Sequence, residues 1–264
     1  MSFSNKVIWI TGASSGIGKS LAIELSNQNA KLILSSRKMA ALELVKKACK
    51  NSSNVKVISL DLEDFTNLKP KVDEAISAFG TIDILVNNGG ISQRSFVKDT
   101  KIAVDKRLMD INYLGTVALT KEVLPHFIKN KKGHFVVTTS IVGKIGTPLR
   151  SSYAASKHAL HGFFDSLRAE HFKDNIAVTL VCPGFVNTNV SKNALTGDGT
   201  PQEKMDVATQ NGMLPERFAK FMAKAIKNKK EEVYIAGAKE KLGVYVKRFF
   251  PKFLSIMIRK LSVT

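Results

Sequence analysis

The stretch VIWITGASSGIGKS, residues 7–20, joins a short apolar run to a glycine-rich turn and then to a helical pattern. Its apolar beginning predicts a buried strand, but the turn has two competing interpretations. Gly12, Gly16 and Gly18 fit a G-x3-G-x-G variant of the turn that binds a dinucleotide at a helix N-terminus. The end of the stretch, ASSGIGKS, equally fits a permissive phosphate loop of a nucleoside triphosphatase. The rest of the chain must decide between an oxidoreductase and an NTPase.

Short apolar runs rich in β-branched residues alternate along the chain with longer segments of helical period. The expected strands are 7–11, 31–35, 55–60, 82–87, 134–139, 176–182 and 232–236. The expected helices are 16–28, 39–51, 66–79, 103–130, 151–173 and 215–228. This alternation predicts one α/β domain over residues 1–264, a doubly wound Rossmann-type fold with a seven-stranded parallel sheet and helices on both faces.

Four polar or glycine-rich motifs each follow an expected strand. They are TGASSGIG (11–18), NNGG (87–90), TTSIVG (138–143) and CPGFVNT (182–188). Ligands of such a sheet bind beyond the carboxyl ends of its strands, so all four motifs point at one edge. Glycines that only permit tight turns would explain one such loop, but they explain four converging loops less well.

The net charge of +18 is concentrated at the C-terminal end, where residues 213–264 hold 13 basic and 4 acidic residues. An anionic membrane surface or a phosphorylated ligand would suit this charge. Nucleic acid is not expected as a partner, because no basic stretch is interleaved with aromatic residues. Cys49 and Cys182 imply no disulfide framework, and the short polar start argues against a signal peptide. A cytoplasmic location is therefore expected.

The segment SSYAASKHAL (151–160) contains the strongest chemical signal. Tyr153 and Lys157 are spaced i, i+4 on an expected helix, so their side chains share one face. Ser140 ends the strand that precedes this helix. Asn112, in DINYLG, lies within the expected helix 103–130, where asparagine is a mediocre helix former. We therefore expect a local distortion or a functional contact at Asn112.

Together these motifs resemble the short-chain dehydrogenase/reductase family, in order and over residues 7–190. The matched elements are TGASSGIG, NNGG, Asn112, Ser140, YAASK and PGFVNT. The stretch GKIGTPLRSSYAASKHALHGFFDSLRAE further resembles the branch of the 11β-hydroxysteroid dehydrogenases and related membrane-associated dehydrogenase/reductases. One departure is visible, because the family's NNAG is NNGG here. Gly89 removes one methyl group, which we expect the turn to tolerate.

The resemblance implies carbonyl–alcohol interconversion on an apolar substrate, such as a steroid, a retinoid or a lipid-derived carbonyl. By this resemblance Tyr153 is the acid–base, Ser140 holds the substrate oxygen, and Asn112 positions a water in a relay with Lys157. A phenol with a pKa near ~10 is a poor base at neutral pH. An ammonium ~4 Å away at an effective dielectric of ~20 contributes about 4 kcal/mol, or about three pKa units. Lys157 is thus expected to lower the pKa of Tyr153 toward about 7.

The cofactor is expected to be NADP(H) rather than NAD(H). The second strand ends in LSSRK without the acid that would accept a ribose 2′-hydroxyl. Arg37 could instead meet a 2′-phosphate with Ser14 or Ser36, although it could also be an ordinary exposed arginine. By resemblance, Asp61 contacts adenine and Thr188 the carboxamide. The expected cofactor-binding residues are Gly12, Ser14, Ser15, Gly16, Ile17, Gly18, Ser36, Arg37, Asp61, Leu62, Asn88, Gly89, Tyr153, Lys157, Pro183, Gly184, Val186 and Thr188.

Two segments have no motif of their own. The irregular stretch 187–212 is expected to be a lid over the substrate. In the basic extension 239–264, apolar residues recur at helical spacing, and Pro251 is expected to kink or split the helix. These apolar residues are Leu242, Val246, Phe249, Phe253, Met257 and Leu261. The basic residues Lys247, Arg248, Lys252, Arg259 and Lys260 fall mostly outside this apolar spacing. This extension could lie on a membrane, close the substrate pocket or pack on a partner subunit.

Several weaker signals complete the analysis. His158 and His161 are expected on the helix surface rather than as metal ligands, and no metal site is predicted. Cys182 is expected to be buried and inert. Phe163, Phe164 and Phe172 are expected in the core or at a subunit interface. By resemblance, the chain forms a homodimer or homotetramer through helices 103–130 and 151–173. A non-catalytic NADP sensor or membrane scaffold on the same fold is the alternative to an enzyme.

Overall fold

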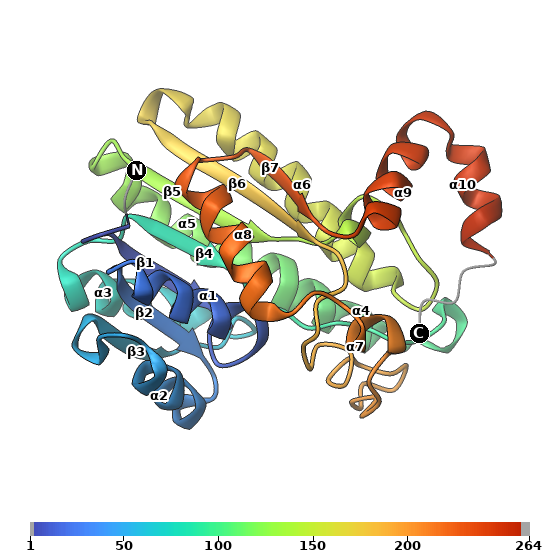
Figure 1. The fold of residues 1–264 in the computed structure, drawn as a ribbon, viewed down its shortest axis with the longest axis horizontal. Coiled ribbons are helices and arrows are strands. Elements are labelled where there is room, and N and C mark those ends of the chain that lie inside the picture. The colour runs from blue at the N-terminus through green and yellow to red at the C-terminus, as the bar shows by residue number, and fades with distance from the viewer. Residues whose placement is uncertain (1–2, 260–264) are drawn as a thin grey trace.

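Seven parallel strands form the centre of the molecule, in the order β3-β2-β1-β4-β5-β6-β7 (Figure 1). The structure is a computed structural model and describes residues 3–259. The strands are β1 Val7–Thr11, β2 Lys31–Ser36, β3 Val55–Ser59, β4 Ile84–Asn87, β5 Gly133–Thr138, β6 Ile176–Pro183 and β7 Glu232–Ile235. Every expected strand is present, with ends shifted by at most two residues. The predicted fold class is confirmed.

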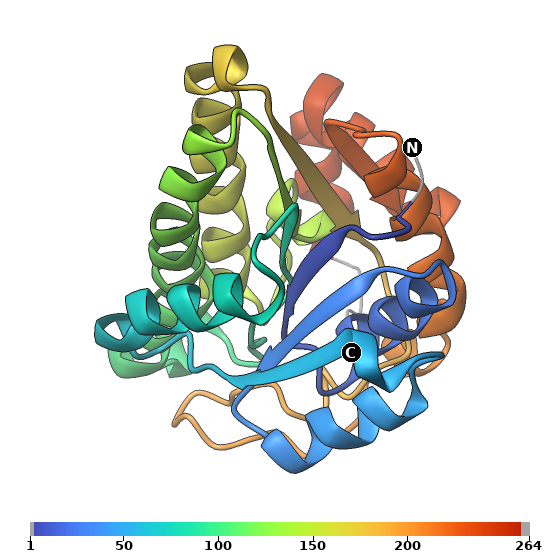
Figure 2. The ribbon, with the colours of Figure 1, turned by 90° about the vertical axis from the view of Figure 1, so that its left-hand side faces the viewer.

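Two layers of helices cover the sheet (Figure 2). One core packs α1 Gly16–Asn27, α2 Met39–Ala48 and α8 Pro215–Lys227 on the sheet, and the other packs α3 Leu68–Phe79, α5 Gly115–Lys129 and α6 Ser151–Glu170. Because successive strand side chains point to opposite faces, Ile8 belongs to the first core and Trp9 to the second. The buried indole N–H of Trp9 donates to Ser35 Oγ at 2.8 Å, so its burial leaves no donor unsatisfied.

The expected helix 103–130 is interrupted in its middle. It consists of α4 Ile102–Met109, a π-helical turn over Asp110–Leu114, and α5. Such turns occur frequently at functional sites. The next residue, Gly115, approaches the main chain so closely that a Cβ there would overlap the carbonyl oxygen of Leu62. The distortion expected at Asn112 is confirmed.

The described residues of the two segments without motifs contain short helices. Segment 187–212 contains the short helix α7 Val207–Gln210, which the sequence pattern did not predict. The extension forms α9 Ala238–Phe249 and α10 Pro251–Ile258, which project from the body of the molecule (Figure 1). The expected split at Pro251 is confirmed, while Lys260 and Leu261 lie outside the described residues. Within residues 3–259, no helix has the length and apolar character needed to span a membrane.

Candidate active site

A cleft of about 560 Å³ follows the carboxyl ends of β1 to β6. The strand order reverses between β1 and β4, and ligands of such a sheet usually bind at this point. All but two of the residues expected at the site line this cleft. They are Gly12, Ser14, Ser15, Gly16, Ile17, Ser36, Arg37, Asp61, Leu62, Asn88, Gly89, Ser140, Tyr153, Lys157, Pro183, Gly184, Val186 and Thr188. The two exceptions are Gly18 and Asn112.

The glycine turn between β1 and α1 fits a phosphate group. Gly12 and Gly16 have φ of +64° and +53°, a region that favours glycine. Ser15 precedes α1 and makes no side-chain cap, so the first N–H groups of the helix remain available to an anion. Gly18 was expected to contact the cofactor but does not line the cleft. It allows close packing, because a Cβ there would overlap Gly12 O and lie 2.6 Å from Asn88 Nδ2.

The phosphate-loop interpretation of this turn is wrong. An NTPase would need Lys19 at the phosphates and Ser20 at a metal ion. Neither residue lines the cleft. Lys19 is exposed and Ser20 is buried in α1, where its hydroxyl faces Glu216 of α8. Their spacing after the glycines is therefore that of ordinary residues in the first turns of a helix.

Two cations lie beside the cleft where β2 ends. Arg37 is half-exposed, and its Nη1 lies 3.9 Å from Asp61 Oδ2. Lys38 follows it, lines the cleft too, and donates its main-chain N–H to Ser36 Oγ at 3.0 Å. The sequence analysis missed Lys38, although its position next to Arg37 was a usable signal. Two basic residues and one carboxylate therefore lie at this corner of the cleft.

Ser140, Tyr153 and Lys157 converge at another part of the cleft. Ser140 follows β5, and the other two lie one turn apart on α6. The side chains of Tyr153 and Ser140 both line the cleft, and Ser140 lowers the pKa of Tyr153. Lys157 Nζ donates to the main-chain oxygen of Thr138 at 2.9 Å and lies 5.9 Å from the centre of the Tyr153 ring. A phenol, a hydroxyl and an amine therefore meet where β5 ends.

The expected effect of Lys157 on Tyr153 is wrong for this structure. Burial raises the pKa of Tyr153 and outweighs the lowering by the Ser140 hydrogen bond and by the charges of Arg94 and Arg150. Burial also lowers the pKa of Lys157 to about 8. Desolvation thus disfavours the charged form of both groups. Arg94 and Arg150, whose positive charges lower the pKa of Tyr153, were not singled out by the sequence analysis.

Asn112 lies behind the cleft wall and holds the π-helical turn in place. Its Oδ1 accepts the N–H of Ile91 at 2.8 Å, and its Nδ2 donates to Ile91 O at 3.0 Å and to Ser156 Oγ at 3.1 Å. A Cβ placed on Gly90 would lie 2.9 Å from Asn112 Oδ1 and 3.6 Å from Lys157 Nζ. Asn112 is thus close to Lys157 but does not line the cleft. Its expected role in a proton relay stays a prediction.

Comparison with known proteins agrees with this geometry. A model of the short chain dehydrogenase family matches residues 6–198. The chain belongs to this family. "Dehydrogenase/reductase SDR family member 7" of Homo sapiens is 42% identical over 251 residues, which cover 93% of this chain and 74% of that protein. "Dehydrogenase/reductase SDR family member 7B" of Rattus norvegicus is 40% identical over 261 residues, covering 96% and 80%.

A solved short-chain dehydrogenase/reductase from Burkholderia phymatum, in complex with NAD, has the same fold. Its TM-score is 0.83 over 96% of each chain, at 22% sequence identity. With the family model and the relatives, this fold identifies the chain as an oxidoreductase that acts on CH–OH groups and binds NAD(P). The resemblance of the sequence to the short-chain dehydrogenase/reductase family is confirmed.

Thr11 is a further residue of this short-chain dehydrogenase that the sequence analysis missed. Its Oγ1 accepts the main-chain N–H groups of Asn88 and Gly89, each at 3.0 Å. Asn88 Nδ2 donates in return to Thr11 O at 3.1 Å. The end of β1 thereby fixes the loop after β4 against the glycine turn. The signal was the position of Thr11 directly before Gly12.

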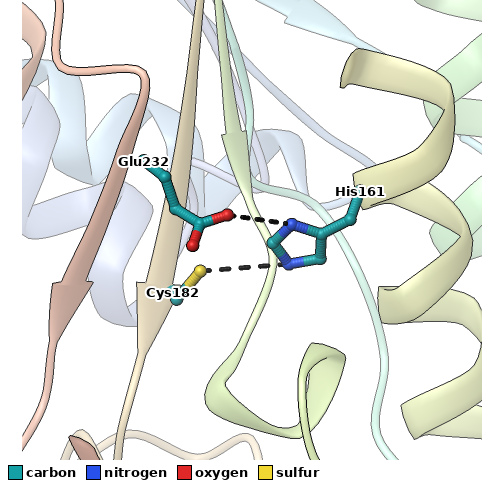
Figure 3. A group of neighbouring side chains, drawn as sticks. All are labelled: His161, Cys182 and Glu232. Carbon is teal, nitrogen blue, oxygen red and sulfur yellow. Dashed lines mark hydrogen bonds and ion pairs between the residues drawn. The ribbon is translucent and has the colours of Figure 1, made fainter. Parts of the chain in front are cut away.

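His161, Cys182 and Glu232 form a cluster beside the active site (Figure 3). His161 Nδ1 faces Glu232 Oε2 at 3.4 Å, and its Nε2 faces Cys182 Sγ at 3.9 Å. One ligand atom from each of the three residues lies within 4.8 Å of the others, but Lys144 Nζ already pairs with Glu232 Oε2 at 2.8 Å. Burial raises the pKa of Cys182 to about 12, which disfavours the thiolate that binds metals. We interpret the cluster as a polar network around the Lys144–Glu232 ion pair that joins α6 to β6 and β7.

The predictions for these side chains had mixed outcomes. His161 is buried, so its expected position on the helix surface is wrong, whereas His158 is exposed as expected. Cys182 is buried, as predicted. Phe164 is a core residue, but Phe172 is 80% exposed and does not belong to the core. The absence of a metal site stays a prediction.

Proposed function

We propose that this dehydrogenase interconverts a carbonyl and a secondary alcohol on an apolar substrate with NADP(H), using Tyr153 as the proton donor and acceptor. The observation that carries the proposal is the convergence of Ser140, Tyr153 and Lys157 in the cleft that also contains the glycine turn. A dinucleotide whose phosphates bind at that turn would supply or accept the hydride in this cleft through its nicotinamide ring.

The chemistry of the side chains follows from their positions. In the reducing direction, the hydroxyl of Tyr153 gives its proton to the carbonyl oxygen, while Ser140 holds that oxygen by a hydrogen bond. Lys157, fixed by Thr138 O, lies next to Tyr153 and can orient the ribose of the cofactor. A water near Asn112 and Lys157 would return a proton to Tyr153. Oxidation of the alcohol follows the same path in reverse.

Replacement of the phenol hydroxyl tests this mechanism. Tyr153→Phe should lower turnover by roughly 10²- to 10⁴-fold, the usual contribution of a positioned acid–base, while NADPH binding persists. NADPH oxidation against a panel of carbonyls measures turnover, and a thermal shift with NADPH measures binding. Tyr245→Phe, at an exposed position of α9, is the matched control and should leave both unchanged. Unaltered turnover in Tyr153→Phe would refute the proposed role.

An apolar substrate is supported by the side chains near the reacting groups. Ile91, Val190 and Leu195 line the cleft. Arg107 also lines it, but its Nε is paired with Glu63 Oε1 at 3.3 Å. A neutral carbonyl should therefore be preferred to one of equal size that carries a carboxylate. Equal kcat/KM for such a matched pair would contradict an apolar site.

We further propose that α9 and α10 rest on an anionic lipid surface. The two helices expose Leu242, Tyr245, Phe249, Phe253, Ile256 and Met257, and Phe250 between them is exposed as well. Their exposed basic residues are Lys239, Lys241, Lys247, Arg248, Lys252 and Arg259. Leu254 packs with Ile141 and Ile145 and holds α10 on the body of the protein. None of the residues 238–259 lines the cleft. This favours a membrane-binding role for α9 and α10 over a role as a lid of the substrate pocket.

Vesicle binding tests this surface. The chain should co-sediment with vesicles that contain anionic lipid and bind neutral phosphatidylcholine weakly, because both charge and apolar area contribute. Phe249→Glu with Phe253→Glu should abolish binding. Leu44→Glu, at an exposed site on α2, is the matched control. Binding that survives the double substitution would contradict the proposed surface.

We retain the expectation of a homodimer or homotetramer formed through α4, α5 and α6. Leu114, between α4 and α5, exposes 41% of its surface, and Phe172 lies just beyond α6. Light scattering coupled to size exclusion measures the mass directly. A monomer at micromolar concentration would contradict this proposal.

A further inference from the structure

The loop of residues 92–95 joins two parts of the cleft that are distant in sequence. Arg94 N donates to Leu195 O, and Leu195 N donates to Ser92 O, both at 2.8 Å. On the other side, Ser95 N donates to Leu149 O at 3.1 Å. The loop therefore pairs with the segment 187–212 along one edge and with the residues before α6 along the other.

Gln93, in the centre of this loop, caps the helix that carries Tyr153. Its side chain is fully buried, and its Oε1 accepts the N–H of Ser152 at 2.9 Å and that of Tyr153 at 3.3 Å. The residue at the N-cap position, Arg150, provides no side-chain cap of its own. Since the first N–H groups of a helix need acceptors, Gln93 fixes where α6 begins.

The neighbouring Arg94 forms a buried ion-pair cluster with Arg150 and Asp206. Arg94 Nε and Nη2 donate to Asp206 Oδ2 at 2.8 and 2.5 Å, and Arg150 Nη2 donates to the same oxygen at 3.3 Å. The side chains of Arg94, Arg150 and Asp206 expose only 6%, 5% and 3% of their surfaces. The second oxygen, Asp206 Oδ1, accepts Gln202 Nε2 at 3.1 Å. Asp206 belongs to segment 187–212, whereas both arginines flank the active site.

We propose that Arg94, Arg150 and Asp206 form a clamp that fixes segment 187–212 onto the start of α6 and so positions Tyr153 for the reaction. The proposal rests on the proposed role of Tyr153. Burial of three charges is costly unless they pair with good geometry, which confines the segment to the conformation that satisfies them. The two guanidinium groups also favour the phenolate, because their charges lower the pKa of Tyr153 against the opposing effect of burial.

The clamp predicts different results for its acidic and basic members. Asp206→Asn frees the segment but keeps both positive charges. It should raise KM for the carbonyl about tenfold or more. The rise of alcohol oxidation with pH should not shift to higher pH. Arg94→Gln frees the segment and removes one positive charge. The rise of alcohol oxidation with pH should therefore shift by about 0.5 to 1 unit to higher pH, in addition to the KM effect.

Three further measurements separate the clamp from a general loss of structure. Arg94→Lys keeps the positive charge and should have nearly the pH profile of the wild type. Asp206→Asn should raise KM only slightly when it is added to Arg94→Gln, because the segment is already free. Trypsin should cleave Asp206→Asn faster at Lys192 or Lys204, both of which are exposed in segment 187–212. Glu203→Gln removes an exposed carboxylate from the same segment and is the matched control, expected to behave as wild type.

The outcomes also distinguish this proposal from the proposed function. An unchanged KM and cleavage rate in Asp206→Asn would overturn the clamp, and an unshifted profile in Arg94→Gln would overturn its electrostatic effect. Either result could occur while Tyr153→Phe still shows the strongly lowered turnover that the proposed function predicts. Full activity of Tyr153→Phe would instead refute the proposed role of Tyr153. If Asp206→Asn fails to fold, Asp206→Glu provides the same cleavage and KM measurements with the charge retained.

Discussion

The two ends of the cleft are held together by different kinds of interaction. The end that fits the phosphates comes from β1, α1 and the loop after β4. It depends on main-chain groups, on glycines that approach one another closely and on the Thr11 hydroxyl, which accepts two main-chain N–H groups. The end that contains Tyr153 is assembled from residues 92–95, α6 and segment 187–212. Its parts are joined by the buried side chains of Gln93, Arg94, Arg150 and Asp206.

This difference predicts what each end tolerates. A main-chain site should accept changes of most neighbouring side chains but not the addition of a Cβ where two backbones meet. A site held by buried charges should respond to the loss of one charge and to pH. Substitutions at each end can test this contrast directly.

The largest effect is expected for Gly18→Ala at the phosphate end. The new Cβ would overlap Gly12 O and lie 2.6 Å from Asn88 Nδ2, so the turn or the start of α1 must shift. We expect a loss of roughly 3 kcal/mol in the free energy of unfolding and a fall of more than ~100-fold in NADPH affinity. Denaturant unfolding and fluorescence titration with NADPH measure the two quantities.

Gly162→Ala is the control for this substitution. Gly162 lies in α6, and a Cβ there would meet nothing within 4 Å. Alanine should therefore stabilise the helix by about 0.5 to 1 kcal/mol and leave NADPH affinity unchanged. Comparable losses in both variants would show that the close contact at Gly18 is not what the turn requires.

The main-chain end of the cleft was largely predictable from the sequence. Strand, turn and helix follow one another within residues 7–27, so Gly12 and Gly16 could be assigned from local spacing alone. The i, i+4 spacing of Tyr153 and Lys157 was equally local. The π-helical turn at Asn112 was anticipated because asparagine is a poor residue for the middle of a helix.

The side-chain end could not be predicted because its partners are far apart in the sequence. Arg94 and Asp206 are separated by 112 positions, and Asp206 lies in a segment without periodicity. Burial is also a property of the folded chain. It reversed the expected direction of the pKa of Tyr153 and placed His161 inside the protein rather than on a helix surface.

The second effect concerns Lys157 and the pH dependence of stability. Burial lowers its pKa from 10.5 to about 8 in the folded protein, so between these values the unfolded chain binds more protons. The free energy of unfolding should therefore rise with pH, by about 2 to 3 kcal/mol between pH ~8 and ~10. Lys157→Met lacks this group and should lack the rise. Urea unfolding at several pH values measures this free energy in both proteins. The same change with pH in wild type and Lys157→Met would contradict a lowered pKa of Lys157.

A smaller effect is expected for Arg37→Ala at the nucleotide end. If Arg37 meets the 2′-phosphate, its loss should weaken NADPH about 10- to 30-fold and leave NADH nearly unchanged. The guanidinium is half-exposed and close to Asp61, which limits the loss. Lys98→Ala, at an exposed lysine outside the cleft, is the control. Equal losses for the two cofactors would refute the 2′-phosphate contact and show that Arg37 acts on nucleotides in general.

The smallest effect tests how tightly the main-chain end is packed. Gly89→Ala restores the alanine of the family pattern NNAG, and its Cβ would lie 2.8 Å from Leu62 Cδ1. That atom is the end of a flexible side chain, so the leucine can rotate at a cost below about 1 kcal/mol. Because Leu62 lines the cleft, NADPH affinity should fall two- to fivefold at most, which is about 0.4 to 1 kcal/mol. A loss as large as that of Gly18→Ala would show that Leu62, and not only the main chain, determines the shape of this end.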